Sequence, residues 1–540
     1  MQALTCWVWA TLLCGAFGCV SSQPTSATTT TTTTTETANP AATTKTALPP
    51  LGFTSLEDEV LYFVLLDRFA NGAADLDDVD ATHQDPGAFH GGDLAGLRQQ
   101  LPMLHDLGVT SLWVSPLALQ VDAALPHVDD DGAAFAHRGF HGYWAERFDV
   151  IDPHFGDDAA LRALLDDAHR LGMKVVLDVV LNHPGYGASY AHDVKWTRST
   201  HTHTCDGTDE RTQCLFGLPD FRTESPEVAD AIVRWTTSWA ERYPFDGFRI
   251  DTLKHVDPQL VATLHERAEA AFRRRQPDVQ RRFLMLGEWW GTSPTSADTR
   301  LIDDGVVDTL FEFSFQGLAA GFASGALGAK ATAHHWQRFH EEVRHPLAPF
   351  VTTHDTLPFM ALVRETAAAK ALAPPTDDDV MLGVAMLLST YGMPVLTYGD
   401  EALRDGRAWP HNRRCWTPAM ADHPRRAQVR AWVQARRAHA GLRQRSFSVV
   451  HAVDDDKGHT LVVDRGEVRV VLHRGGARTL PTSRRWRRVD GAAPGGPAAV
   501  WAPGAPLQLL RSQASMWISA AAENSAELLE KQQEKSVSSR

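Results

Sequence analysis

The stretch "DDAALRALLDDAHRLGMKVVLDVVLNH" (Asp157–His183) contains one complete helix-to-strand unit, and it decides the fold. Its first half places apolar residues three and four positions apart, which is typical of an amphipathic helix. Its second half is rich in valine and leucine and ends on polar residues, as a buried strand of a parallel sheet does. The order of these two patterns predicts a repeating βα architecture.

Seven other stretches repeat the strand pattern, and helical patterns separate most of them. They are "EVLYFVLLD" (Glu59–Asp67), "GVTSLWVSP" (Gly108–Pro116), "FDGFRID" (Phe245–Asp251), "RFLMLGEWW" (Arg282–Trp290), "VVDTLFEFSF" (Val306–Phe315), "PFVTTHD" (Pro349–Asp355) and "GMPVLTYGD" (Gly392–Asp400). Eight such units predict an α/β fold, a (β/α)8 TIM barrel whose active site lies at the carboxyl ends of its strands. A doubly wound open sheet is the alternative, but no glycine-rich dinucleotide fingerprint follows the first strand.

Composition and loop lengths divide the 540 residues into six parts. A long polar connection after the third strand predicts an inserted domain, because long connections without helical or strand patterns are usually functional. The paired β-runs in "TLVVDRGEVRVVLH" (Thr460–His473) predict a C-terminal β-sandwich domain. The predicted parts are a signal peptide (1–20), a Thr-rich disordered tether (21–50), the barrel (51–440) with its inserted domain at about 184–225, the β-domain (441–511) and a polar tail (512–540).

The N-terminus predicts export. The apolar run "LTCWVWATLLCGAFGCV" (Leu4–Val20) is too short to span a bilayer comfortably and matches the core of a signal peptide. "AFGCVSS" is similar to a bacterial lipoprotein signal with Cys19 as the lipidated residue, while simple secretion remains the alternative. We therefore expect a bacterial protein that is secreted or lipid-anchored at the cell envelope, and a monomer.

Net charge and cysteine positions restrict the kinds of binding partner and metal site that the sequence allows. The net charge of −14 excludes nucleic acid as an obvious partner, because phosphates would repel the chain, and a neutral polymer fits better. Cys205 and Cys214 enclose a polar loop, and a disulfide between them is permitted outside the cytosol. "HTHTC" (His201–Cys205) offers zinc as an alternative there, but the spacing matches no standard structural zinc pattern. Cys415 remains as a buried thiol.

Acids and histidines stand where the predicted strands end: Asp178, His183, Asp251, Glu288, His354 and Asp355. A single acid at a strand end is more often a helix cap than a catalyst. Several acids with two histidines at matched strand ends are harder to explain as caps, since parallel strands bring them to one barrel mouth. Carboxylates gathered in a pocket repel one another, so some acquire the raised pKa that an acid catalyst requires.

These segments give the chain a family resemblance. "DVVLNH" (Asp178–His183), "GFRIDTLKH" (Gly247–His255), "GEWW" (Gly287–Trp290) and "TTHD" (Thr352–Asp355) resemble, in order, the four hallmark segments of the α-amylase superfamily of glycoside hydrolases (family 13). "GLPDF" (Gly217–Phe221) resembles the family's segment in the inserted domain. The resemblance covers about residues 52–414 and implies a barrel, an inserted domain B and a C-terminal β-domain.

The resemblance also assigns the catalytic roles. Asp251 resembles the nucleophile that forms a covalent glycosyl-enzyme, and Glu288 resembles the acid that protonates the glycosidic oxygen and later activates water. Asp355 resembles the third carboxylate, which binds hydroxyls of the distorted sugar. A retaining glycosidase needs the first two carboxyl groups only about 5 Å apart.

Other residues resemble the family's binding groups. Arg249 beside Asp251 would keep that carboxylate ionised. The residues that resemble sugar-binding groups are Tyr143, His183, His354, Arg413 and the leaving-group pair Lys254 and His255. The residues that match the structural calcium site are Asn182, Asp220 and His255 through its carbonyl, and oxygen ligands suit Ca²⁺. A loop at Asn71–Asp78 with Gly91 and Asp93 partly fits a second calcium site, with a solvated acidic turn as the alternative.

The implied activity is retaining hydrolysis of internal α-1,4 bonds in starch or related α-glucans. One departure is Thr353, which stands where the family usually has asparagine and makes the exact specificity doubtful. The alternatives are a cyclomaltodextrinase, neopullulanase-like or glucanotransferase activity on maltodextrins, for which the aromatic Phe216 is a weak indication. An inactive glucan-binding barrel is the alternative from another class, against which all three carboxylates speak.

Overall fold

Eight parallel strands form the centre of the molecule. The computed structural model describes residues 48–76, 83–129, 131–200, 205, 209–490 and 500–519, and its main sheet has the order β13-β12-β11-β10-β7-β2-β1-β14. The strands are β1 (Leu61–Val64), β2 (Ser111–Val114), β7 (Lys174–Val179), β10 (Gly247–Ile250), β11 (Leu284–Gly287), β12 (Thr309–Glu312), β13 (Ala348–Pro349) and β14 (Val395–Thr397). A parallel bridge from Phe350 to Val395 joins the two ends of the sheet. The sheet therefore closes into the (β/α)8 barrel. Seven of the eight predicted strand stretches contain one of its strands, and the stretch Pro349–Asp355 overlaps β13 only at Pro349.

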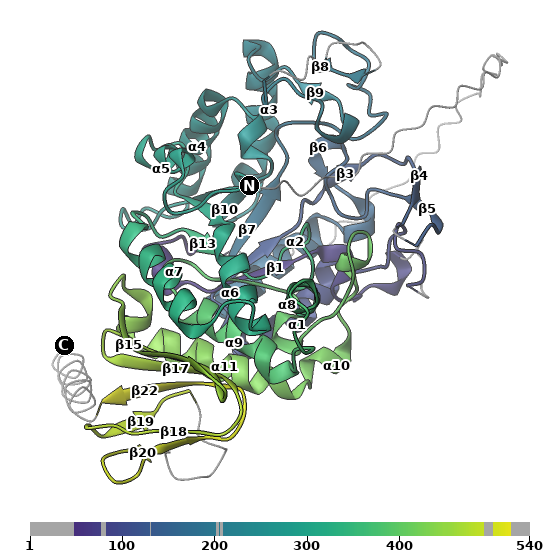
Figure 1. Cartoon of the computed structure of the whole chain (residues 1–540). Helices are drawn as coiled ribbons and strands as arrows, with labels where there is room; N and C mark the ends of the chain where they lie inside the picture. The colour runs from purple at the N-terminus through teal and green to yellow at the C-terminus, as the bar shows by residue number, and fades with distance from the viewer. Residues whose placement is uncertain are drawn as a thin grey trace, which may run out of the picture. The chain divides into compact units, whose positions relative to one another are not determined.

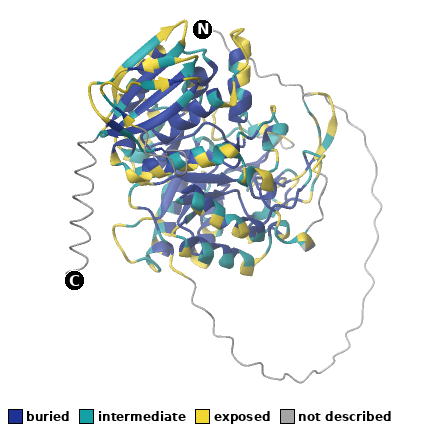
Figure 2. Ribbon diagram, turned by 90° about the horizontal axis from the view of Figure 1, so that it is seen from below, coloured by how far each residue is buried: buried dark blue, intermediate teal, exposed yellow. Residues whose placement is uncertain are grey.

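Helices cover the outside of the barrel (Figure 1). They are α1 (Leu94–Leu107), α2 (Asp158–Arg170), α3 (Pro226–Arg242), α4 (Pro258–Arg273), α5 (Arg300–Asp303), α6 (Ser314–Ser324), α7 (Ala329–Glu342), α8 (Phe359–Ala369), α9 (Asp377–Leu388), α10 (Pro418–Ala421) and α11 (Pro424–Ala438). All residues of β1, β2, β10, β11 and β12 are buried, and Figure 2 shows the sheet as a dark blue interior beneath mixed helices. Burial on both faces explains why these strands read as continuous apolar runs.

Two long connections depart from the simple βα plan. Between β7 and α3 the chain forms the short antiparallel pair β8 (Thr197–Arg198) and β9 (Asp220–Phe221), and Cys205 is bonded to Cys214, which confirms the predicted disulfide. Between β2 and α2 lie β3 (Ala118–Gln120) and β6 (Ala145–Ile151), which pair with each other, and the hairpin of β4 (Leu125–Val128) and β5 (Ala134–His137). Both connections leave the barrel at the carboxyl ends of its strands, where the active site is expected.

The C-terminal part is an all-β unit below the barrel in Figure 1. Its six-stranded antiparallel sheet contains β15 (Ser448–Asp455), β16 (Gly458–Arg465), β17 (Val468–Gly475), β19 (Trp486–Arg488), β20 (Val500–Trp501) and β22 (Gln513–Ser519), and β18 (Arg478–Leu480) pairs with β21 (Leu507–Leu509). On β15, Asp454 Oδ1 accepts a hydrogen bond of 2.5 Å from the amide of Ala329 at the start of α7, which ties this sheet to the barrel.

One predicted boundary needs correction. The sequence predicts a β-domain that ends at residue 511 and a polar tail after it, but β22 lies inside that tail and occupies the sheet position between β17 and β19. Its apolar residues stand beside an alanine run, which hid the strand pattern. Met516, Trp517 and Ile518 of this strand are buried, so the β-unit extends to Ser519.

The predicted signal peptide, most of the Thr-rich tether and the tail from residue 520 lie outside the described residues. Among the helices that the structure describes, none combines the length and the apolar character needed to cross a bilayer.

Candidate active site

One buried arginine binds three carboxylates at the carboxyl ends of neighbouring strands. Arg249 of β10 donates from Nη1 to Asp251 Oδ1 at 2.8 Å and to both carboxylate oxygens of Asp178 at 2.9 and 3.0 Å. Its Nη2 lies 3.0 Å from Glu288 Oε2. All four side chains are at least nine-tenths buried. The structure therefore brings together Arg249 and the two predicted catalytic residues Asp251 and Glu288, with Asp178 as a fourth member.

Strand register places the two catalytic candidates side by side on neighbouring strands. Ile250 of β10 pairs with Gly287 of β11, so Asp251 and Glu288 leave neighbouring parallel strands at the same level. Such strands lie about 4.8 Å apart. This spacing agrees with the separation of about 5 Å that lets one carboxylate reach a sugar carbon directly while the other protonates the bond oxygen.

Glu288 is suited to hold a proton. Burial raises its pKa to about 8, against the opposing effect of Arg249 and with further upward effects from Asp251 and Asp355. The backbone amide of Thr252 donates to Glu288 Oε2 at 3.0 Å and fixes the direction of the carboxyl group. At neutral pH this side chain is mostly protonated, as a general acid must be.

The third predicted carboxylate lies in a separate cluster of contacts. Arg413 donates from Nη2 to Asp355 Oδ1 at 2.9 Å and from Nε to the carbonyl of His354 at 3.0 Å. His354 Nε2 lies 3.1 Å from Asp355 Oδ2. Desolvation would raise the pKa of Asp355, but His354, Arg413 and Arg249 outweigh it and lower that pKa. The Asp355 side chain is one-third exposed, so an ionised carboxylate faces the open mouth of the barrel.

Thr353, the departure from the family pattern, has a structural role here. Its Oγ1 accepts a hydrogen bond of 3.2 Å from the amide of Asp355. The side chain therefore supports the backbone of the third carboxylate.

Aromatic and imidazole rings form a wall beside the acids. The ring of Tyr143 stacks on His354 with centroids 5.2 Å apart and an angle of 3°, and its hydroxyl donates to Asp178 Oδ2 at 2.7 Å. Burial lowers the pKa of His354 to about 3 and also lowers the pKa of His183, so both imidazoles are neutral near pH 7. His183 Nε2 is buried and has no hydrogen-bond partner among the described residues. A sugar hydroxyl is a suitable partner for such an atom.

The predicted leaving-group pair lies against the disulfide loop. Lys254 Nζ forms an ion pair of 2.6 Å with Glu210 Oε1, and His255 Nδ1 lies 2.5 Å from the Glu210 carbonyl oxygen. Both polar groups of this pair therefore already have a protein partner. Sequence reasoning missed Glu210, because nothing in the polar loop between Cys205 and Cys214 distinguishes this acid from its neighbours.

The three predicted calcium ligands meet at one point. One end of the Asn182 side-chain amide lies 2.9 Å from the carbonyl oxygen of His255 and 3.1 Å from Asp220 Oδ1. If the amide nitrogen of Asn182 occupies this end, it donates a hydrogen bond to each of the two oxygens. If the amide oxygen occupies it, the three oxygens form a set that suits Ca²⁺. Arg198 occupies the second oxygen of Asp220 at 3.0 Å, and burial raises the pKa of Asp220 to about 8 against the effect of Arg198. These residues fit a cation, which would offset the cost of burying the carboxylate.

At the two other predicted metal positions, protein groups already use the proposed ligand atoms. In the possible second calcium loop, Asp93 caps α1 through a hydrogen bond from Gly96 and also accepts from the amides of Gly72 and Ala73, while residues 77–82 lie outside the described residues. Backbone donors therefore use both oxygens of Asp93. The zinc alternative at "HTHTC" loses Cys205 and Cys214 to their disulfide, and His201 and His203 lie outside the described residues.

Sequence reasoning left two positioning residues without a role. Asp178 accepts from Arg249, from Tyr143 and, at 2.9 Å, from the indole nitrogen of Trp113 on β2. Asn412 donates to the carbonyl of His354 at 2.7 Å and holds the segment that carries Arg413. The parallel register of β7 and β10 pairs Asp178 with Arg249, and this pairing was the signal for Asp178. No local sequence pattern indicates the role of Asn412.

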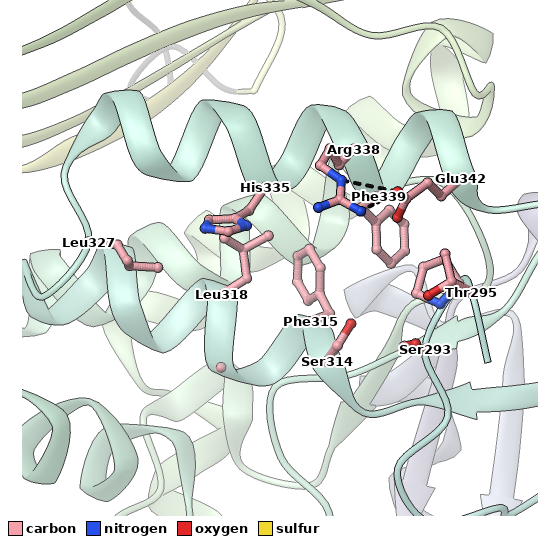
Figure 3. A pocket seen from close by; sticks show the side chains of 12 residues that line it. Ser293, Thr295, Ser314, Phe315, Leu318, Leu327, His335, Arg338, Phe339 and Glu342 are labelled. Atoms are coloured by element: carbon pink, nitrogen blue, oxygen red, sulfur yellow. Dashed lines mark hydrogen bonds and ion pairs between the residues drawn. The ribbon is translucent and has the colours of Figure 1, made fainter. Parts of the chain in front are cut away.

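A cavity of about 370 Å³ lies between α6, α7 and the loop that follows Glu288 (Figure 3). Phe315, Phe339 and the ion-paired side chains of Arg338 and Glu342 line it. None of the three predicted catalytic carboxylates lines this cavity, so it is separate from the acidic cluster.

Comparison with known proteins agrees with the geometry. The family model for the catalytic domain of alpha amylase matches residues 63–213 and 208–443. The periplasmic alpha-amylase of Escherichia coli is 28% identical over 432 residues, covering 64% of this chain and 60% of the relative, so the chain spans less than two thirds of that protein. Neopullulanase 2 of Thermoactinomyces vulgaris is 26% identical over 468 residues, covering 77% of this chain and 71% of the relative. A crystal structure of an Anoxybacillus alpha-amylase superposes with a TM-score of 0.68 at 25% identity, covering 86% of this chain and 98% of that one.

Proposed function

Since the chain belongs to the α-amylase family of glycoside hydrolases, we propose that it cleaves internal α-1,4-glucosidic bonds of starch or related α-glucans with retention of configuration. The observation that carries this proposal is the guanidinium of Arg249, which binds Asp251 and Glu288 at the same level of two neighbouring strands. Two carboxylates bound by one guanidinium favour the close carboxyl spacing of retaining enzymes over the wider gap of inverting ones.

The residues divide the chemistry into two steps. In the first, Asp251 attacks the anomeric carbon while Glu288 gives its proton to the glycosidic oxygen, so that one C–O bond forms as the other breaks. In the second, the Glu288 carboxylate takes a proton from water, and the resulting nucleophile displaces Asp251 from the sugar. Asp355 and the neutral rings of His183 and His354 are placed to bind hydroxyls of the distorted sugar.

We further propose that a structural Ca²⁺ binds Asn182, Asp220 and the carbonyl of His255, because these oxygens converge on one point. The ion would connect the end of β7 to β9 and to the segment after β10, and so support the site from outside the reacting carboxylates. Export, with or without lipid on Cys19, remains our proposal from the N-terminal sequence pattern, and an extracellular polymer would require it.

A second candidate function is hydrolysis or transfer on maltodextrins. Neopullulanase 2 aligns over a larger share of its own length than the periplasmic alpha-amylase does. Phe216 is 87% exposed beside the site's inserted segment, and an exposed aromatic ring is a suitable platform for an incoming sugar. Lys254 already forms an ion pair with Glu210, which weakens the case that Lys254 and His255 bind a long glucan chain.

The two candidates are separated by purified protein incubated with amylose, pullulan and β-cyclodextrin. Release of reducing ends from amylose, with the α-anomer formed first in NMR spectra, is the expected result, and Asp251→Asn is the inactive control. Preferential cleavage of the cyclic substrate or of pullulan would favour the second candidate. No release from any of the three by a folded wild-type protein would refute both.

A further inference from the structure

Three side chains from two distant segments meet beside the barrel mouth. His83 and His90 belong to the loop before α1, and Cys415 follows the segment that carries Arg413. One ligand atom from each of the three lies within 4.8 Å of the other two. None of these residues takes part in the proposed hydrolysis or in the proposed calcium site.

Hydrogen bonding fixes the state of the central histidine. His90 Nε2 lies 2.8 Å from the backbone carbonyl oxygen of Asp85, and a carbonyl can only accept, so Nε2 carries the hydrogen. His90 Nδ1 therefore presents its lone pair, and it does so toward Cys415 Sγ at 3.0 Å. A backbone acceptor on the far nitrogen is the usual outer partner of a histidine that binds a metal.

The other two groups can approach the same point. The ring of His83 stacks on that of His90 with centroids 4.7 Å apart and an angle of 15°, so both imidazoles share one side of the cluster. His83 is exposed and stands in a loop, which leaves its ring free to adjust. Cys415 is partly buried and, among the cysteines that the structure describes, is the one outside the disulfide.

We propose that His83, His90 and Cys415 bind a thiophilic divalent metal ion of the Zn²⁺ class, with water as the fourth ligand. One thiolate and two neutral imidazoles form a set that zinc accepts in proteins, whereas calcium prefers oxygen. As the metal–sulfur bond forms, the thiol proton passes to solvent, and no electron is transferred. Zinc–nitrogen and zinc–sulfur distances of about 2.1 and 2.3 Å at a tetrahedral angle place the two ligand atoms about 3.6 Å apart, so His90 and Cys415 must separate by about 0.6 Å from their present 3.0 Å.

The ion would join the loop before α1 to the chain that positions Arg413, two residues from Cys415. Arg413 holds Asp355 and the backbone of His354, so metal binding would stiffen one wall of the active site without touching the reacting carboxylates. This proposal does not depend on the proposed glucan hydrolysis, and its test reads the metal site directly.

Alkylation of Cys415 in the full-length protein tests the site. N-ethylmaleimide labelling of the Cys415 peptide is followed by mass spectrometry while ZnCl₂ or CaCl₂ is titrated. We expect one equivalent of Zn²⁺ to slow the labelling of Cys415 by about tenfold or more and CaCl₂ to leave it unchanged. His83→Ala should require about tenfold more Zn²⁺ for the same protection, since loss of one ligand or its support costs on this scale. His334→Ala, which removes another exposed histidine on α7, is the matched control and should behave as wild type.

Two labelling results would overturn the proposal. Labelling that Zn²⁺ does not slow would mean that Cys415 is no ligand. Equal zinc dependence in the His83→Ala and His334→Ala proteins would mean that His83 takes no part. Because His83 is exposed, its replacement is not expected to disturb folding, and a circular dichroism spectrum of each variant checks this. Cobalt provides an independent readout: a thiolate charge-transfer band with strong visible bands of tetrahedral Co²⁺ is expected in wild type, and its absence would also contradict the site.

Discussion

The proton on Glu288 gives the most direct prediction. With a pKa of about 8, about nine-tenths of this carboxyl is protonated at pH 7, whereas at the ordinary value of 4.5 only about 0.3% would be. Burial thus increases the fraction of enzyme whose Glu288 is protonated at pH 7 by about 300-fold, equivalent to about 3.4 kcal/mol. Since the acid must be protonated to act, activity should be present below pH 8 and fall about tenfold per pH unit above it.

The assay compares two substrates whose leaving groups differ in their need for a proton. The value of kcat/KM for maltopentaose, measured from pH 5 to 10, should show an alkaline limb centred near 8, because this constant reports the free enzyme. With α-maltosyl fluoride, whose leaving group needs little protonation, the same limb should be weak. Glu288→Gln should reduce kcat/KM for maltopentaose by about 10² to 10⁴-fold, the usual contribution of acid catalysis, and affect the fluoride far less.

A neighbouring carboxyl supplies the control. Burial also raises the pKa of Glu312, on the next strand, to about 7, but this side chain accepts hydrogen bonds from Ser314 and from the amide of Phe315 at the start of α6. Glu312→Gln should therefore leave the alkaline limb in place. A limb centred below pH 6, a limb shared equally by the fluoride, or a limb that moves in Glu312→Gln and not in Glu288→Gln would refute the assignment.

The same proton links stability to pH. Because the folded-state pKa of Glu288 lies above its ordinary value, the stability associated with the bound proton is complete below about pH 4.5 and is lost as the pH rises toward 8. Glu288→Gln carries no such proton, so its Tm should fall less between pH 5 and 8 than that of wild type. Equal slopes in a thermal scan series would contradict the raised pKa independently of activity.

Three further predictions concern the nucleophile, calcium and the disulfide. Asp251→Asn should lower kcat by at least about 10⁴-fold, the scale on which loss of a nucleophile acts, while calorimetry still detects maltotriose binding. EGTA should lower the Tm of wild type but not that of Asn182→Ala; an ion present at 100 times its Kd adds about 2.7 kcal/mol, and an equal response of both proteins would exclude this site. Replacing Cys205 and Cys214 by serine opens a loop with a sequence separation of 9 and should cost about 2–3 kcal/mol in urea unfolding; an unchanged midpoint would mean that the loop is ordered without the bond.

The barrel was predictable because its strands are buried on both faces. That burial forces continuous apolar runs such as "KVVLDVVL", and the helices between them keep a clear 3.6-residue period. The gathering of Asp251 and Glu288 at one edge of the sheet was predictable for a related reason, since parallel strands bring their carboxyl ends to one place. The register between β10 and β11 adds what the sequence could not contain, namely that Asp251 and Glu288 stand at the same level.

The features that escaped prediction depend on contacts between distant polar residues. Lys254 ends against Glu210, and the hairpin of β4 and β5 reaches the segment after β14, where Asp129 pairs with His411 at 3.0 Å. No period or motif encodes such pairs, because each charged residue alone looks like part of a solvated surface. The strand β22 escaped for another reason: its short apolar run is followed by alanines that dilute the pattern.

The division of labour among the acids follows from a charge count around Arg249. This guanidinium faces Asp178, Asp251 and Glu288, and three ionised carboxylates against one cation would leave two uncompensated negative charges in a buried cluster. At least one of the three carboxyl groups is therefore expected to stay protonated, because protonation removes an uncompensated buried charge. Asp178 accepts from Arg249, Tyr143 and Trp113, and burial raises its pKa only to about 7, whereas Glu288 has fewer donors and a pKa of about 8. Burial therefore raises the pKa of both carboxyl groups, and their placement distinguishes them: Glu288 stands at the level of Asp251 on the neighbouring strand, whereas Arg249, Tyr143 and Trp113 donate to Asp178.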